Sequence, residues 1–192
     1  MRRVLLLVAL LGMGLSAQDA GEPYWGVQIG AVRGDFSPSL KGANGPTLGV
    51  HYTYPFSPRQ EIRFAVDALS INGKTETWDL YGGGGWGPIL DSGPYQIRAN
   101  AQTIRLDYRL HFFRGGTGPY VAPGLLIGRY EETTRFNGPL HPFYDHNSGV
   151  DWATSVALGM QFRHSFALEL GTRTFNNQEM LKHFTLTASY HF

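Results

Sequence analysis

Apolar side chains alternate with small or polar ones along most of the chain, and a period of two predicts β-strands with two different faces. Eight segments carry this pattern, near residues 25–31, 48–54, 62–68, 104–112, 121–127, 152–162, 166–170 and 184–192. One set of alternate positions is apolar throughout and includes Leu106 and Leu168. The other set is small or polar and holds all the charges of these strands. The pattern therefore predicts a sheet with one apolar and one polar face.

The connections between the predicted strands alternate in length. Long ones are expected near 34–46, 72–95 and 131–149, with a shorter fourth near 176–181, whereas short ones fall near 55–59, 114–118 and 163–165. Short turns at one end and long loops at the other are typical of an antiparallel up-and-down meander whose ends face different surroundings. In the fifth strand, Pro123 removes a ladder hydrogen bond, and we expect a β-bulge there.

Side-chain size indicates which face of a closed eight-stranded sheet points inward. The interior of such a barrel is just wide enough for side chains to fill it. The apolar face carries many bulky groups, whereas the polar face has glycine, alanine, serine and threonine around a few long ions. Turning the four arginines of the polar face toward lipid would cost up to about 2 to 4 kcal/mol each near the bilayer midplane. The predicted fold is therefore all-β, an eight-stranded antiparallel up-and-down transmembrane β-barrel with its apolar face outward.

The charged residues of the polar face form the candidate interior site. Four cations stand against three anions, a nearly balanced set: Arg63, Asp67, Arg105, Asp107, Arg109, Glu169 and Arg173. Buried charges persist only when they are paired and hydrogen-bonded, so we expect an interior polar network that fills the lumen. The alternative interpretation is the charged lining of a narrow channel.

Aromatic residues cluster at the strand ends beside the short turns. Amphipathic rings favour the boundary between lipid and headgroups, so we expect a girdle there and expect the short turns to face the periplasm. The girdle would comprise Tyr24, Trp25, Tyr54, Phe56, Phe112, Phe113, Tyr120, Phe162, Phe166, Tyr190 and Phe192.

The beginning of the chain has the pattern of an export signal. Two arginines precede an apolar run from Val4 to Leu15, and small residues follow up to Ala17. The run is shorter than the roughly 20 apolar residues that a spanning helix needs. We therefore expect residues 1–17 to be a cleaved signal peptide and residues 18–192 to form the barrel domain.

Composition excludes several function classes. The 16 Lys and Arg against 15 Asp and Glu give a net charge of +1, which leaves no strong basic footprint for nucleic acid. The absence of cysteine removes disulfides, thiolate zinc sites and cysteine nucleophiles. Glycine is frequent, at 25 of 192 residues, and charged residues make up only 16%, as expected of a chain of strands and turns.

Over residues 18–192, the chain resembles the small eight-stranded outer-membrane barrels of the OmpA-transmembrane-domain and OmpX type. The resemblance rests on the export signal, the eight alternating segments and the closing segment Phe184 to Phe192 with its terminal phenylalanine. It implies a location in the bacterial outer membrane and contact with outer-membrane lipid and lipopolysaccharide. It also implies that Tyr190 and Phe192 are the signal read by the outer-membrane insertion machinery.

The third long loop contains the most reactive set of side chains: His141, Tyr144, Asp145, His146, Asn147 and Ser148. The segment His146 to Ser148 is similar to the His-x-Ser core of the outer-membrane lipid A deacylases, but no acid beyond Asp151 follows it to orient a base. Two histidines and an aspartate could also hold a divalent ion, although such a polar loop is usually solvated. The run Gly82 to Gly87 lacks the Lys-Ser/Thr pair of a phosphate loop and is interpreted as a loop tip.

The expected protein is an outer-membrane barrel with a structural or surface-interaction role through its extracellular loops, without catalysis, and we expect a monomer. It would need no catalytic residue, cofactor or metal, and its partners would be lipid, the insertion machinery and an external ligand or surface, not nucleic acid. The competing hypotheses are a lipid-modifying enzyme of the lipid A deacylase kind, a narrow channel and a soluble periplasmic carrier resembling the lipocalins.

Overall fold

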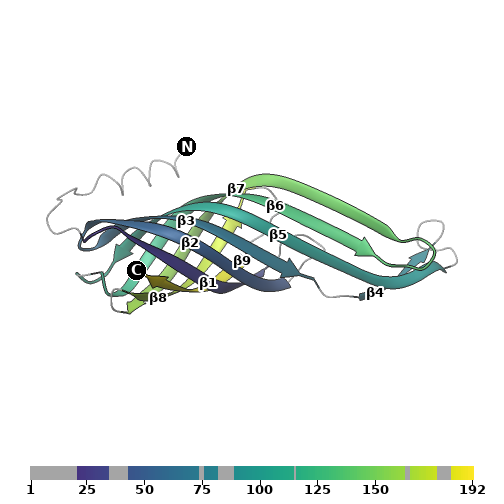
Figure 1. Cartoon of the computed structure of the whole chain (residues 1–192), viewed down its shortest axis with the longest axis horizontal. Helices are drawn as coiled ribbons and strands as arrows, with labels where there is room; N and C mark the ends of the chain where they lie inside the picture. Colours follow the sequence, from purple (N-terminus) through teal and green to yellow (C-terminus); the bar gives the residue numbers. More distant parts are fainter. Residues whose placement is uncertain are drawn as a thin grey trace.

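The computed structural model describes residues 21–34, 43–73, 76–81, 89–114, 116–162, 165–176 and 183–192. The predicted signal peptide and the glycine-rich loop tip at 82–87 lie outside these residues. The strands are β1 (Tyr24–Gly34), β2 (Ala43–Ser57), β3 (Gln60–Asn72), β4 (Glu76–Tyr81), β5 (Ile89–His111), β6 (Gly118–Phe136), β7 (Phe143–Phe162), β8 (Phe166–Phe175) and β9 (His183–His191) (Figure 1). Within the described residues, no helix is long and apolar enough to span a bilayer.

Eight of these strands close into an antiparallel barrel. Each pairs with its neighbour in the order β1, β2, β3, β5, β6, β7, β8 and β9, and the pairing of β9 with β1 completes the ring. The predicted eight-stranded up-and-down barrel is therefore confirmed. Closure leaves no unpaired strand edge around the wall, which is what a sheet needs in order to lie in hydrocarbon.

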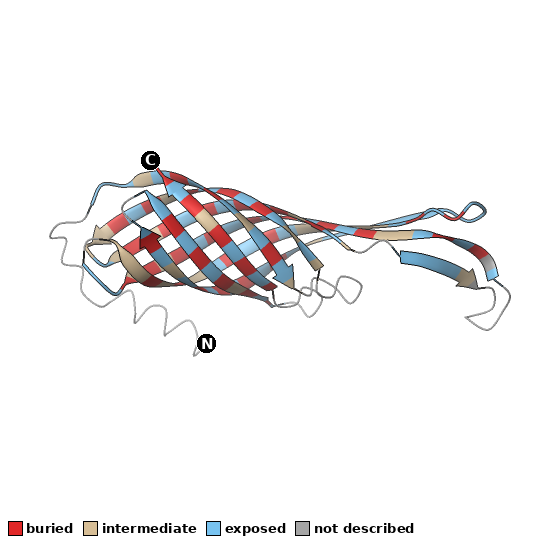
Figure 2. Ribbon diagram, turned by 90° about the horizontal axis from the view of Figure 1, so that it is seen from below, coloured by how far each residue is buried: buried red, intermediate tan, exposed pale blue. Residues whose placement is uncertain are grey.

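Exposure alternates along the barrel strands (Figure 2), and the large hydrophobic side chains of these strands are mostly on the exposed positions. The side chain of Leu106 is 43% exposed, whereas Arg105 and Asp107 on either side of it are 5% and 2% exposed. The same holds in β8, where Leu168 is 39% exposed and Glu169 only 3%. The barrel thus has a polar interior and an apolar outer surface, which is the arrangement of a membrane barrel.

Small residues on the inner face make room for the large polar ones. A Cβ atom added to Gly49 would collide with the carboxylate of Asp67, and one added to Gly159 would collide with the ring of Tyr120. A narrow lumen can hold charged and aromatic side chains only where the residues that face them are small.

Two predicted long loops are largely β-structure, and their prediction as loops was wrong. β4 pairs with the beginning of β5, and the β6–β7 ladder continues out to the pair Phe136 and Phe143. These segments form a four-stranded sheet that extends from one end of the barrel (Figures 1 and 2). We call it the projecting sheet and define it as β4 with residues 89–97 of β5, 131–136 of β6 and 143–150 of β7.

The β-bulge expected at Pro123 is absent from the described β5–β6 ladder. Asp107 lies opposite Gly124 and Leu110 lies opposite Val121, so the register is the same on both sides of the proline. On its other side Pro123 is paired with Val156 of β7. The missing N–H is accommodated by a local break in one ladder rather than by an inserted residue.

The aromatic girdle is only partly as predicted. Eight of its members are exposed on the outer surface: Trp25, Tyr54, Phe112, Phe113, Phe162, Phe166, Tyr190 and Phe192. Tyr120, in contrast, is fully buried, and the hydroxyl of Tyr24 donates to Oε2 of Glu61 at 3.1 Å, so both turn toward the lumen. An aromatic residue at a strand end fits either face, and the alternation of polarity does not distinguish them.

Candidate functional site

Eight buried charged side chains of the lumen come from three strands. β3 supplies Glu61, Arg63 and Asp67, β5 supplies Arg105, Asp107 and Arg109, and β8 supplies Glu169 and Arg173. All eight are buried. β3 and β5 are neighbours in the wall, whereas β8 is separated from β3 by β2, β1 and β9 on one side of the ring. Contacts between the two groups therefore cross the lumen.

Arg63 is the centre of the charged cluster. Its Nη1 and Nη2 donate to the two carboxylate oxygens of Glu169 at 2.7 and 2.8 Å. Its Nε and Nη2 also donate to Oδ2 of Asp107 at 2.9 and 2.7 Å. One guanidinium thus holds two carboxylates, one on the neighbouring strand β5 and one across the lumen on β8, and such charge-assisted forks are the stronger hydrogen bonds of proteins.

Toward the end that carries the projecting sheet, the ion pairs continue through Asp67. Nε of Arg105 lies 3.4 Å from Asp107 and 3.5 Å from Asp67, and Nη2 of Arg173 lies 3.1 Å from Asp67. The side-chain amide of Gln28 also donates to Asp67, and its oxygen accepts from Arg105 at 3.3 Å. A second ion pair therefore crosses from β3 to β8.

Toward the short-turn end, the ion pairs continue through Arg109. Its Nη2 lies 3.3 Å from Oε1 of Glu169 and its Nη1 lies 3.7 Å from Oε2 of Glu61. The same oxygen of Glu61 lies 3.3 Å from Nε2 of His111, and the guanidinium of Arg109 lies 4.8 Å from the centre of the Tyr120 ring. Glu61 was missed by the sequence analysis because it precedes the apolar run that marked the strand.

The seven charged residues named from the sequence thus lie in one connected array, and Glu61 extends it. Cations and anions alternate along the array in the order Arg173, Asp67, Arg105, Asp107, Arg63, Glu169, Arg109 and Glu61. Four positive charges meet four negative ones, so each ion has an opposite neighbour on the path through the barrel. This arrangement can hold the walls of the barrel together.

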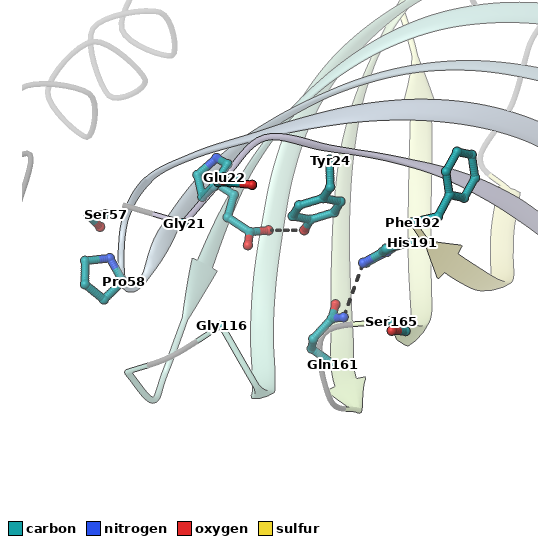
Figure 3. A pocket seen from close by; sticks show the side chains of 12 residues that line it. Gly21, Glu22, Tyr24, Ser57, Pro58, Gly116, Gln161, Ser165, His191 and Phe192 are labelled. Carbon is teal, nitrogen blue, oxygen red and sulfur yellow. Dashed lines mark hydrogen bonds between the residues drawn. The ribbon is translucent and has the colours of Figure 1, made fainter. Parts of the chain in front are cut away.

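A recess of about 460 Å³ opens at the short-turn end of the barrel (Figure 3). Its lining includes Tyr24, Glu61, Gln161 and His191, with Nε2 of Gln161 lying 3.3 Å from Nδ1 of His191. The ring of Tyr24 stacks on that of His191 with centroids 4.8 Å apart. Since Glu61 lines the recess and also belongs to the ion-pair array, the recess adjoins the charged cluster.

At the opposite end, the projecting sheet has its own internal order. Oδ2 of Asp91 accepts from the backbone N–H groups of Leu140 and His141 at 2.9 and 2.6 Å, which ties β5 to the β6–β7 turn. The N–H of Asn137 donates to the carbonyl of Pro94 at 3.0 Å. Burial opposes ionisation of Asp91, but the three backbone N–H groups that it accepts from outweigh this and hold the pKa of its carboxyl below its usual value.

The side chains that suggested chemistry at 141–148 are exposed on the β6–β7 hairpin. His146 and Ser148 lie on one face of β7, and the carboxylate of Asp145 accepts from the backbone N–H of His146 at 2.9 Å. The described side chains of the hairpin are therefore not arranged as a catalytic triad, in which an aspartate contacts a histidine and the histidine contacts a serine. In the part of the chain that the structure describes, no three His, Asp or Glu residues gather as a metal site.

Comparisons with known proteins agree with this geometry. Residues 4–192 match the family described as outer membrane protein beta-barrel domain. A major outer membrane protein of Thermus thermophilus has a similar structure, with a TM-score of 0.60, 15% sequence identity and coverage of 90% of this chain and 100% of that chain. No protein of curated function matches the sequence significantly.

Two further solved structures share the fold. The attachment invasion locus protein Ail of Yersinia pestis, solved with the heparin analogue sucrose octasulfate, gives a TM-score of 0.56 at 11% identity over 90% of this chain and 100% of that chain. The N-terminal β-barrel domain of Pseudomonas aeruginosa OprF gives 0.50 at 10% identity over 91% and 100%. With its closed eight-stranded wall and its outward apolar face, the chain belongs to the outer membrane protein beta-barrel domain family and is a protein of the bacterial outer membrane.

Proposed function

We propose that this protein acts at the cell surface through its projecting sheet, with the barrel as a membrane anchor and without catalysis. In bacterial outer-membrane barrels the short turns face the periplasm and the longer connections face the exterior. The projecting sheet lies at the end opposite the short turns, which supports a location outside the cell. The observation that carries the proposal is that these outer segments form an ordered sheet rather than irregular loops.

The edges of the projecting sheet support a role in binding. Among the described residues, β4 pairs only with β5, and residues 143–150 of β7 pair only with β6, so each presents a strand edge without a described partner strand. Edge strands offer unpaired N–H and C=O groups to which an extended segment of another molecule can add. Natural sheets usually shield such edges, and their exposure beyond the membrane favours contact with a partner.

Exposed apolar side chains give the same indication. Trp78, Leu140 and Phe143 are 50%, 70% and 44% exposed, and all three lie beyond the barrel wall, where water rather than lipid surrounds them. Clustered apolar groups in water mark interaction surfaces. The relative from Yersinia pestis was solved with a bound heparin analogue, which supports surface binding as a role that barrels of this size can perform.

We also propose that the charged lumen is a structural element rather than a channel. The alternating array of eight ions fills the path between the recess and the projecting sheet, and desolvated ions in such an array hold one another in place. Single-channel recording of the reconstituted protein should therefore give no steady conductance, and a steady ion-selective conductance would support the channel instead.

The surface role is tested by removing the projecting sheet while keeping the barrel. Residues 133–146 are replaced by Asn-Gly, which can close the hairpin at the pair Glu132 and Asn147, and residues 74–96 are replaced by a short glycine-rich turn. Cells displaying the intact or the trimmed protein are compared for adhesion to immobilised proteins and glycosaminoglycans.

The trimmed protein should keep its heat-sensitive gel shift, which reports barrel folding, and should lose adhesion. Equal adhesion by both proteins would contradict the proposal. A trimmed protein that adheres poorly only because it fails to reach the outer membrane is recognised by the gel shift and by surface labelling.

A further inference from the structure

We propose that one face of the projecting sheet binds cationic amphipathic peptide segments, with arginine or lysine side chains seated on its aromatic rings. The inference rests on the proposed surface role and names the kind of partner. It is argued from the residues that share that face, from their charge and from their exposure.

Four aromatic residues, one from each strand, gather on this face. Tyr95 of β5, Phe136 of β6 and Phe143 of β7 lie in one row of directly paired residues, and residues paired in this way share a face. The rings of Phe136 and Phe143 stack at 5.4 Å, and Trp78 of β4 stacks on Tyr95 at 4.4 Å with planes only 20° apart. We call this the aromatic face.

The aromatic rings are accessible. Trp78 is 50% exposed and Phe143 is 44% exposed, whereas Phe136, which stacks on Phe143, is 2% exposed. Tyr95 connects the two stacked pairs, because it stacks on Trp78 and its ring centre lies 6.4 Å from that of Phe143. Electron-rich ring faces attract guanidinium and ammonium groups, most strongly for tryptophan, and they also cover apolar groups.

All ionised side chains that the described strands place on the aromatic face are acidic. Glu76 is paired with Tyr95, Asp145 lies one row nearer the barrel opposite Thr134, and Glu132 follows in the next row opposite Ala99. Asp91 is also on this face, but its carboxylate is engaged by backbone N–H groups. Three carboxylates around an aromatic row favour a positively charged partner.

The opposite face of the same sheet has a different charge. Within the projecting sheet it carries Arg135, Asp79 and Glu131, and Arg98 and Arg129 lie next to it on the same side of the adjoining barrel strands. Nε of Arg98 donates to Asn72 and Nε of Arg135 donates to Asn137, both at 2.8 Å, while Arg129 pairs with Glu131 at 2.9 Å. We therefore expect a cationic segment to bind the aromatic face, because the other side carries three arginines against two carboxylates, one of which is already paired with Arg129.

The aromatic face is built before a ligand arrives. The Asp91 contacts to the β6–β7 turn and the Asn137–Pro94 hydrogen bond hold β5 against β6 and β7 near the ring row. A preformed platform loses little conformational entropy on binding, so weakly attractive contacts are enough for measurable affinity.

The test measures binding of three probes to the full-length protein in nanodiscs of uncharged lipid. The probes are a fluorescent peptide of alternating lysine and leucine, a peptide of alternating glutamate and leucine of equal length, and sucrose octasulfate. The cationic peptide should bind at least tenfold more tightly than the acidic one, and the difference should shrink as salt is raised. Equal binding of the two peptides would overturn the proposal.

Paired variants locate the binding face. The double variant Glu76→Gln with Asp145→Asn removes two charges from the aromatic face, whereas Asp79→Asn with Glu131→Gln removes two from the opposite face. The first should weaken binding of the cationic peptide at least tenfold and the second less than twofold. Trp78→Ala should weaken it at least fivefold, and Trp78→Phe should restore much of the loss. Equal effects of both double variants would overturn the proposal.

The outcomes also separate this inference from the proposed function. If the protein fails to bind the cationic peptide but binds sucrose octasulfate in a way that trimming the sheet abolishes, the partner chemistry is wrong and the surface role stands. If no ligand distinguishes the intact from the trimmed protein, both are wrong.

Discussion

At the scale of single residues, each central carboxylate of the lumen serves more than one cation. Glu169 accepts from Arg63 at 2.7 and 2.8 Å and from Arg109 at 3.3 Å, and all three side chains are almost fully buried. Ions removed from water are stable only while their partners remain, so the loss of one carboxylate leaves two guanidinium groups without their shared anion.

The variant Glu169→Gln should therefore lower the free energy of unfolding by about 3 to 5 kcal/mol. Urea titration of the protein in phospholipid vesicles, followed by the gel shift of the folded barrel, measures the loss. The matched control is Glu131→Gln, which removes the same group from the exposed pair with Arg129 and should change the free energy by less than about 1 kcal/mol. Equal losses in both variants would contradict the role of the buried array.

Outside the membrane, the contact of a second residue, Asp91, with the β6–β7 turn should depend on pH. Its carboxyl has a folded-state pKa below the ordinary value of 3.8, because its backbone hydrogen bonds outweigh the effect of burial. The contact is therefore fully stabilising above pH 3.8 and is lost as the pH falls through the lowered folded-state pKa. The amide NMR signals of Leu140 and His141 should titrate with a midpoint below 3.8, and should lose this step in Asp91→Asn. A midpoint at or above 3.8 would contradict the assignment.

At the scale of elements, β9 both closes the ring and carries the proposed insertion signal. Tyr190 and Phe192 are 54% and 72% exposed on the outer surface. They are thus accessible to the insertion machinery in the way that the family resemblance implies, and neither belongs to the ion-pair array of the lumen.

The variant Phe192→Ala should slow outer-membrane assembly several-fold in cells while leaving the refolded barrel stable in detergent. Pulse labelling followed by the gel shift measures the rate. Phe184→Ala in the same strand removes an outward ring that is 62% exposed, and it should assemble at the normal rate. If both variants assemble equally slowly, the terminal residue is not a specific signal.

The sequence was informative for the elements that lie in the membrane and much less so beyond it. Lipid on one side and a polar lumen on the other force strict alternation, as in Ile104, Arg105 and Leu106, and this alternation predicted the barrel strands. The projecting sheet meets water on both faces, so Glu131 to Phe136 lack an apolar face and were predicted as a loop. Pairing there depends on the partner strand, which periodicity does not reveal.

The interior site was predictable for a related reason. A charge inside an alternating apolar strand has only the lumen to face, which identified Arg63, Arg105 and Glu169. Glu61 precedes the apolar run and Tyr120 is amphipathic, so polarity alone did not place either of them. Which ions meet across the lumen depends on the closure of the barrel, because Arg63 and Glu169 lie on strands far apart in the sequence.

At the scale of the whole molecule, the chain has three zones with different surroundings. A recess opens at the short-turn end, a lumen with buried ion pairs follows within the apolar wall, and an ordered sheet extends beyond the other end (Figures 1 and 3). The location in the outer membrane excludes the soluble periplasmic carrier considered from the sequence. All three zones depend on the same feature, a wall whose apolar side chains face lipid and whose ions face inward.

Two adjacent leucines test this feature most directly. Leu125 is 41% exposed on the outer surface, and Leu126 is 3% exposed in the interior. In the methyl-labelled protein in lipid nanodiscs, a paramagnetic group carried on lipid acyl chains should strongly broaden the methyl signals of Leu125 and leave those of Leu126 nearly unchanged. Stronger broadening of the Leu126 signals than of the Leu125 signals, or equal broadening of both, would contradict a barrel wall whose apolar side faces lipid.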